Sequence, residues 1–330
     1  MTPLALTTTA VIGAMLSLWS CAQASSARST FRIDSNLVLL EVMTPRAQGR
    51  GPVETLRRED FRIFDNERPV AIKTFDVGDA ARPLALWFVV QCNMQGWERK
   101  GSGLFRGQIE RLASAMRKLD TRDTVAVAHW CDDGGSMIDL RPTASFEQAR
   151  NAIEAALDPI PDPRDHNRSG ELALQSTLAK IIEASRGNAT GPIPVVVFLY
   201  GDYSGMPKIE ADRFVVELLR TSAIVYGVRD SRSPRIGSLW FAHEQGAVAN
   251  YVATQTGGQY FSATPDGYAA ALETILDQLH SRYELGFRPE ALDGKLHRLR
   301  VELSDEAKQR FGAVPLRYRA AYVPASPAAH

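Results

Sequence analysis

The sequence predicts an α/β protein in which a doubly wound, mostly parallel sheet is inserted in a small antiparallel β-domain built from both termini. Two observations predict this fold class. In the middle of the chain, continuous apolar runs such as residues 84–90 and 195–200 alternate with helical patterns, which is typical of βαβ units. Toward both ends, short segments of alternating apolar residues replace this rhythm, which indicates antiparallel strands.

The N-terminal part, residues 25–82, carries β-forming segments with no helical signal between them. A Gly- and Pro-containing stretch at 45–52 predicts a loop, and Asp65-Asn66 predicts a turn. Strands are expected at 31–33, 37–43, 60–64 and 70–75.

The central part, residues 83–280, predicts the doubly wound domain, with strands and helices in alternation. Strands are expected at 84–90, 124–130, 195–200, 223–228 and 259–261. Helices are expected around 109–119, 146–157, 172–184, 214–219, 248–252 and 272–279. In such sheets, the loops after the carboxyl ends of the strands form the usual ligand crevice.

The C-terminal part, residues 281–323, alternates again and contains the hairpin signal Asp293-Gly294. Strands are expected at 283–287, 297–303 and 316–320. We expect them to join the N-terminal strands in one β-domain, because two separate small sheets would each leave exposed edges. Residues 324–330 predict a disordered tail.

The overall composition is that of a folded protein without a dominant charge. The 330 residues include 38 Lys and Arg and 38 Asp and Glu, and hydrophobic residues make up 45%. This excludes disorder over most of the chain. It also argues against nucleic acid as a partner, because phosphate binding requires an excess of basic residues.

The first 24 residues contain no charged side chain and predict a secretory signal peptide. Their apolar run, residues 10–19, is shorter than the ~20 residues of a spanning helix. Ala22-Gln-Ala24 predicts cleavage after Ala24. One alternative is a lipoprotein, because the residues before Cys21 resemble a bacterial lipobox, and another is an uncleaved anchor. Each places the mature chain outside the cytoplasm, in the periplasm, at the cell surface or in the medium.

Two further cysteines, Cys92 and Cys131, follow neighbouring strands of the predicted sheet. Adjacent strands lie ~4.8 Å apart, and a disulfide requires Cα atoms within about 7 Å. An exported compartment permits the bond. The alternative is a pair of packed thiols, since free cysteine is often buried.

Three segments carry a resemblance to a known family. They are Leu56 to Phe75, Ala253 to Phe261 with its Thr-Gly-Gly turn, and Tyr283 to Pro289 followed by Asp293 to Val301. With the central strands and helices, they resemble the VWFA-related proteins, bacterial secreted proteins abundant in Acidobacteria that contain a von Willebrand factor A domain. The resemblance covers about residues 30–323 and keeps the order of the segments.

The resemblance implies a position for one binding site. Von Willebrand A domains commonly hold a divalent ion with Asp-x-Ser-x-Ser in a first loop, a Thr in a second and an Asp in a third. Here the first motif becomes Gln91, Asn93 and Gln95, Glu171 lies near the Thr position, and Asp202 lies near the last Asp. The resemblance therefore implies a degenerate metal-ion-dependent adhesion site. We call these five residues the loop rim.

Neutral amides carry no formal charge, and Mg²⁺ usually requires one or two carboxylates. We therefore expect no specific metal and no cofactor. The alternative is a rearranged Mg²⁺ site in which Glu171 and Asp202 act with the acidic neighbours Asp132 and Asp133.

No nucleophile, zinc or nucleotide motif of a known enzyme class occurs in the sequence. His129 lies in a predicted buried strand and is interpreted as a core histidine. We expect a non-catalytic protein-binding or scaffold module that uses the loop rim, with a protein partner and with membrane contact only through a lipid on Cys21. The alternatives are a membrane-anchored structural lipoprotein and an enzyme, such as a hydrolase, with an unrecognised site.

Overall fold

The structure is a computed structural model that describes residues 37–45, 56–92, 103–131, 136–157, 170–185, 191–200, 208–231 and 250–324. The predicted signal peptide, with Cys21 and Ala24, lies outside these residues. So do the strand expected at 31–33, nearly all of the loop expected at 45–52 and nearly all of the predicted tail.

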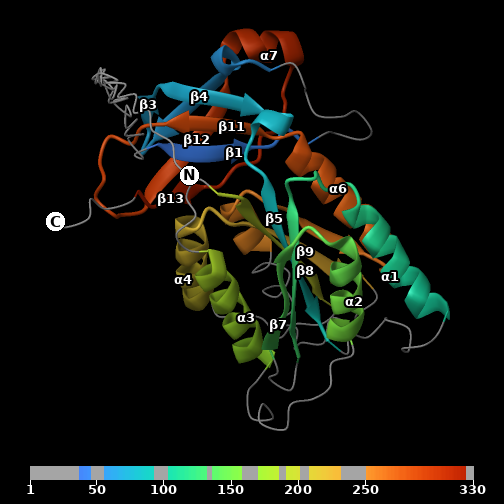
Figure 1. The fold of residues 1–330 in the computed structure, drawn as a ribbon. Coiled ribbons are helices and arrows are strands. Elements are labelled where there is room, and N and C mark those ends of the chain that lie inside the picture. The colour runs from blue at the N-terminus through green and yellow to red at the C-terminus, as the bar shows by residue number, and fades with distance from the viewer. Residues whose placement is uncertain are drawn as a thin grey trace, which may run out of the picture. The chain divides into compact units, whose positions relative to one another are not determined.

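The middle of the chain forms a six-stranded sheet in the order β10-β9-β8-β5-β6-β7 (Figure 1). Neighbouring strands are parallel except for β6 and β7, which are antiparallel. If β5 to β10 are numbered 1 to 6 in chain order and the sheet is read from the β7 edge, the order is 3-2-1-4-5-6, as in doubly wound folds. The strands are β5 (Leu84–Gln91), β6 (Thr124–Trp130), β7 (Ser136–Thr143), β8 (Ile193–Tyr200), β9 (Ile224–Asp230) and β10 (Tyr260–Ala263).

Helices cover both faces of this sheet, which explains why its central strands are apolar without interruption (Figure 1). In β5, Leu86 and Phe88 pack into the core on one face, and Trp87 and Val89 pack into the core on the other. The first face is covered by α1 (Gly103–Met116), α2 (Phe146–Leu157) and α6 (Tyr268–His280). The second is covered by α3 (Gly170–Ser185), α4 (Lys208–Arg220) and the helical residues 250–255.

Strands from the two ends of the chain pair with each other in two antiparallel sheets that share one hydrophobic core. We call this part the sandwich. One sheet has the order β1-β11-β4 and the other β13-β12-β2-β3. Val38 pairs with Phe287, and Ile63 pairs with Val301. The strands are β1 (Val38–Val42), β2 (Phe61–Asp65), β3 (Arg68–Val70), β4 (Ile72–Val77), β11 (Tyr283–Phe287), β12 (His297–Leu303) and β13 (Ala321–Tyr322). The predicted fold class is confirmed.

A C-terminal segment, residues 316–322, connects the sandwich to the central sheet. Arg317 forms an isolated antiparallel bridge with Met43, and Arg319 forms one with Thr256. The buried guanidinium of Arg319 also donates to the Ser222 hydroxyl at 2.7 Å. The strand expected at 316–320 is therefore replaced by isolated bridges, because the segment crosses from one sheet to the other instead of following a single strand.

Some elements in the described residues were not predicted, and the strand expected at 70–75 is divided into β3 and β4, because the chain passes from one sandwich sheet to the other at Ala71. β7 forms the antiparallel edge of the central sheet, and α7 (Asp305–Phe311) follows β12. Ser304 begins α7, since its hydroxyl accepts a hydrogen bond from Ala307 N at 3.2 Å. Short 3₁₀ turns occur at η1 (Arg58–Asp60), η2 (Gly78–Ala80) and η3 (Pro265–Gly267). In the part of the chain described, the search for a helix long and apolar enough to span a membrane finds none.

Candidate functional site

The predicted site lies at the carboxyl ends of the parallel strands, where doubly wound folds bind ligands. At this edge the structure describes Gln91, the last residue of β5, with Cys92 after it, and Trp130, the last residue of β6, with Cys131 after it. Gln91 and Trp130 are register partners, and the Cys92 N–H donates to the Trp130 carbonyl at 2.9 Å. The two strand ends therefore lie side by side.

Gln91, at the position that the resemblance gives to a metal-binding Asp, is only 2% exposed. Its amide provides dipoles but no formal charge. Mg²⁺ gives up its bound water only reluctantly, and at this position no carboxylate charge compensates for that loss.

Most of the loop rim and its acidic neighbours lie outside the described residues, so their roles stay predictions. These residues are Asn93, Gln95, Asp132, Asp133 and Asp202. Glu171 follows the first residue of α3, Gly170. Among the residues that the structure does describe, no three His, Cys, Asp or Glu side chains group together as a metal site would require.

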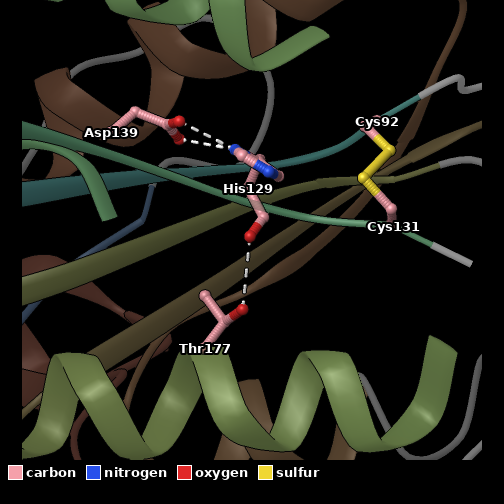
Figure 2. Close-up of a disulfide and its surroundings, with 5 residues drawn as sticks. All are labelled: Cys92, His129, Cys131, Asp139 and Thr177. Carbon is pink, nitrogen blue, oxygen red and sulfur yellow. Dashed lines mark hydrogen bonds and ion pairs between the residues drawn. A yellow bond between two sulfur atoms is a disulfide. The ribbon is translucent and has the colours of Figure 1, made fainter. Parts of the chain in front are cut away.

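Cys92 and Cys131 form a disulfide, as one of the two sequence interpretations predicted (Figure 2). Their Cα atoms lie 5.0 Å apart, and the bond joins residues 39 positions apart in the chain. Both cysteines are buried. The bond fixes the spacing of two strand ends directly beneath the loops that follow them.

His129 lies two residues before this disulfide and is paired with a carboxylate (Figure 2). Its Nδ1 atom is 2.8 Å from both carboxylate oxygens of Asp139 on β7. The hydroxyl of Thr177 donates to the backbone carbonyl of His129 at 3.3 Å and not to its ring. The hydroxyl and the ring therefore do not form the nucleophile–base contact of a catalytic triad. His129 acts as a core histidine with a satisfied ring nitrogen.

Two exposed residues at the β7 edge of the central sheet were not among the predicted site residues. Met137, near the start of β7, is 52% exposed. Lys180 on α3 donates to the Ser136 carbonyl at 2.7 Å and to its hydroxyl at 3.1 Å. Lys180 therefore attaches α3 to the start of β7. The sequence signal was weak, because this edge strand was not recognised.

The segments that carry the family resemblance lie elsewhere, in the sandwich and at its junction with the central sheet. In the sandwich, Asp65 contacts His297 Nδ1 at 2.8 Å and accepts from the Tyr322 hydroxyl at 2.7 Å. Asp293 lies 3.1 Å from His297 Nε2. Burial and the bond to Asp65 raise the pKa of Tyr322. Both His297 nitrogens and the Tyr322 hydroxyl are engaged, so this cluster is structural.

The Thr256-Gly257-Gly258 turn has a similarly structural role. The Thr256 hydroxyl accepts from the Val225 N–H at 3.1 Å. Gly258 lies so close to β9 that a Cβ there would be 1.9 Å from the Val225 carbonyl oxygen. Gly257 has a φ of +87°, and a Cβ would lie 2.8 Å from Arg319 N. Only glycine fits at either position.

A buried ionic cluster joins Arg82, two positions before β5, to the sandwich. Arg82 donates to Glu284 at 2.6 Å and also to Glu41. Burial works against the charged guanidinium, but the two glutamates outweigh it and raise the pKa of Arg82. Burial raises the pKa of Glu284. This cluster stabilises the junction at the amino ends of the strands, opposite the loop rim.

No protein-family model matches the chain, and no curated protein is similar to it. A search of solved structures finds matches at low identity. BatB from Bacteroides thetaiotaomicron is 13% identical with a TM-score of 0.39, covering 59% of this chain and 97% of its own. A von Willebrand factor type A protein from Catenulispora acidiphila is 12% identical with a TM-score of 0.41, covering 81% and 72%.

A third structure is proximal thread matrix protein 1 from the mussel byssus, with a zinc-occupied metal-ion-dependent adhesion motif. It is 10% identical with a TM-score of 0.45, covering 65% of this chain and 49% of its own. Likenesses of this degree transfer neither a metal nor a partner. The α/β architecture follows from the strand order itself.

Proposed function

We propose that the chain is an exported, non-catalytic protein-binding or scaffold module that binds a protein partner through the loop rim without a metal ion. The observation that carries the proposal is the Cys92–Cys131 disulfide. It joins the carboxyl ends of β5 and β6 covalently, at the place where binding loops begin. A rim whose supporting strands are fixed in this way does not depend on a bound ion to hold those strand ends together.

The buried Gln91 supports the metal-independent part of this proposal, because it places a neutral amide where the family pattern has an acid. We infer a degenerate adhesion site of the kind that the resemblance to the Acidobacteria-type VWFA-related proteins implies. We keep the predicted division into a central domain at 83–280 and flanking strands at 25–82 and 281–323.

The hydrogen bonds of the two buried histidines in the described residues, His129 and His297, support the proposal that the module is non-catalytic. The Asp139–His129 pair does not contact the Thr177 hydroxyl through its ring, and His297 is held between two aspartates. The Tyr322 hydroxyl lies 3.3 Å from His297 Nδ1, but it is buried and donates to Asp65, so neither arrangement presents a base and a nucleophile to a substrate.

Capture from an envelope extract of the producing bacterium tests the binding function. The chain beginning at Ser25 is immobilised through its C-terminus, and bound proteins are identified with EDTA or with Mg²⁺. We expect one protein to be captured equally in both conditions. It should be lost with the rim variant N93A/Q95A/D202A and kept with the matched helix variant E147A/Q148A/N151A, whose residues lie exposed or partly exposed on α2.

Capture that survives the rim variant would refute the rim as the binding surface. Capture abolished by EDTA would refute metal independence. Calorimetric titration with Mg²⁺ and Mn²⁺ gives a direct check, with no saturable heat expected. Saturable heat that disappears in E171Q/D202N would instead establish the rearranged acidic site.

Export and anchoring are tested by mass spectrometry of the mature N-terminus. We expect the chain to begin at Ser25. An acylated Cys21 at the N-terminus would establish the lipoprotein alternative, and an intact Met1 would refute cleavage.

A further inference from the structure

A second surface feature lies away from the loop rim, where the amino end of β10 meets the C-terminal segment. It is a groove of about 510 Å³. One wall is formed by helical residues 250–255 and by Gln259 and Tyr260, and the other by the segment around Tyr318 with Leu299 of β12. The groove therefore lies between the central sheet and the sandwich, and both parts of the fold contribute side chains.

The groove has a fixed shape because the backbone beneath it is held closely. Gly257 and Gly258 line it, and both must be glycine to let the C-terminal segment and β9 approach. The Ala320 N–H donates to the Gln255 carbonyl at 2.9 Å, and the Gly227 N–H donates to the Gln259 carbonyl at 3.0 Å. These bonds attach both walls to the same backbone frame.

Two tyrosines supply the apolar surface, one from each side. Tyr260 is half-buried against the core under α3 and α4, and Tyr318 is half-buried against the sandwich core. Each ring is thus held by its own core while lining the groove. A ring held in this way loses little conformational entropy when a ligand stacks on it, and its hydroxyl can still form hydrogen bonds.

The polar lining consists mainly of amides and a hydroxyl. Asn250 and Thr254 are exposed and one helical turn apart, so they share a face. The Gln259 side-chain oxygen accepts from Gln278 at 3.3 Å, which orients its amide and leaves its NH₂ group to donate elsewhere. Arg317 also lines the groove, and no Asp or Glu is among its described lining residues.

We propose that this groove binds a short oligosaccharide. The apolar C–H face of a sugar ring matches a tyrosine ring, and vicinal hydroxyls match amides, which donate and accept at once. Arg317 is the single charged residue among the described lining residues, and its guanidinium can donate to a sugar hydroxyl. The ligand would be bound and not cleaved, because glycoside hydrolysis requires two carboxylates beside the bond.

The test measures binding of soluble hexasaccharides of glucose (α-1,4 and β-1,4 linked) and of N-acetylglucosamine to the chain beginning at Ser25 by calorimetry. We expect saturable binding of at least one of them below about 10 mM. Loss of one amide contact in N250A or Q259A should weaken it about fivefold. N151A, which removes an exposed Asn from α2, should leave it unchanged.

Tyr318 needs two variants because it also packs against the sandwich. Y318F keeps the ring and should retain binding within about twofold, whereas Y318A should lose at least tenfold. If Y318A does not fold, as judged by its thermal melt, the amide variants still decide. No saturable binding of any hexasaccharide, or equal binding by N250A, Q259A and wild type, would overturn the proposal. Binding of a decaproline peptide instead would reassign the groove to extended peptides.

Discussion

Removing the Cys92–Cys131 bond should lower the free energy of unfolding by about 4 kcal/mol. The bond closes a loop between residues 39 positions apart. In the chain-entropy account, a closed loop of this length removes about 13 cal/mol/K from the unfolded state, or about 4 kcal/mol at 25 °C. For a chain of this size, the same loss corresponds to a fall in melting temperature of about 6 °C.

The assay is urea unfolding of the chain beginning at Ser25, followed by tryptophan fluorescence and circular dichroism. The double variant C92A/C131A is compared with oxidised wild type and with wild type kept in dithiothreitol. Reduced wild type retains the buried sulfur atoms, so its difference from the double variant isolates the loss of packing. Thiol counting under denaturing, non-reducing conditions should find no free thiol in the oxidised chain. Two reactive thiols, or a stability difference below about 1 kcal/mol, would refute the reasoning.

Three further outcomes are expected at the junction and in the central sheet. D123N should cost about 1–3 kcal/mol at pH 7, because the buried carboxylate accepts from the N–H of the first residue of β5. Burial alone would raise the pKa of Asp123, but its hydrogen bonds lower it overall, so its stabilisation is present above about pH 4 and is lost as pH falls through the folded pKa. Thermal melts from pH 7 to pH 2 should show the wild type approaching the variant. G258A should destabilise by more than about 2 kcal/mol in urea, because its Cβ would meet the Val225 carbonyl, whereas G107A in α1 should be neutral or stabilising. R82M should cost about 3–5 kcal/mol by leaving two buried glutamates without their hydrogen-bonded cation, and a smaller loss would show that Arg282 or water compensates their charge.

The central sheet could be predicted because burial on both faces leaves a strong pattern. The runs at 84–90 and 195–200 consist of apolar and aromatic residues, and they form most of β5 and β8, respectively. The strand order then placed Cys92 beside Cys131, which is why the disulfide could be expected before any coordinates. Pairing of the two chain ends followed from the need to cover sheet edges.

β7 was missed because its residues do not follow an alternating or continuous apolar pattern. It contains Asp139, Arg141 and Pro142, and its pairing with β6 is interrupted by register shifts. The partner of His129 was missed for the same reason, since Asp139 reaches it only across this irregular antiparallel edge. α7 is one short helix of seven residues, too brief for a periodic signal.

The candidate rim could be reached only through the family resemblance. Spacing alone does not show that Gln91, Glu171 and Asp202 belong together. Gln91 ends β5, Glu171 lies in the first turn of α3 and Asp202 comes two positions after β8 in the sequence, so the three are far apart in the chain. The groove at Tyr260 and Tyr318 could not be predicted from the sequence either, since its walls come from segments that meet only in the folded chain.

The pairing of the two chain ends has a consequence for how the protein is made. β1 and β2 are synthesised before the central sheet, and their partners β11 and β12 are synthesised after it. Tyr322, whose hydroxyl donates to Asp65, follows Asp65 by 257 residues. Contacts so distant in sequence form slowly, and apolar strand faces that wait for partners are prone to aggregation. The sandwich can therefore bury the apolar faces of β1 and β2 only after the whole central sheet, which lies between its two halves in the sequence, has been synthesised.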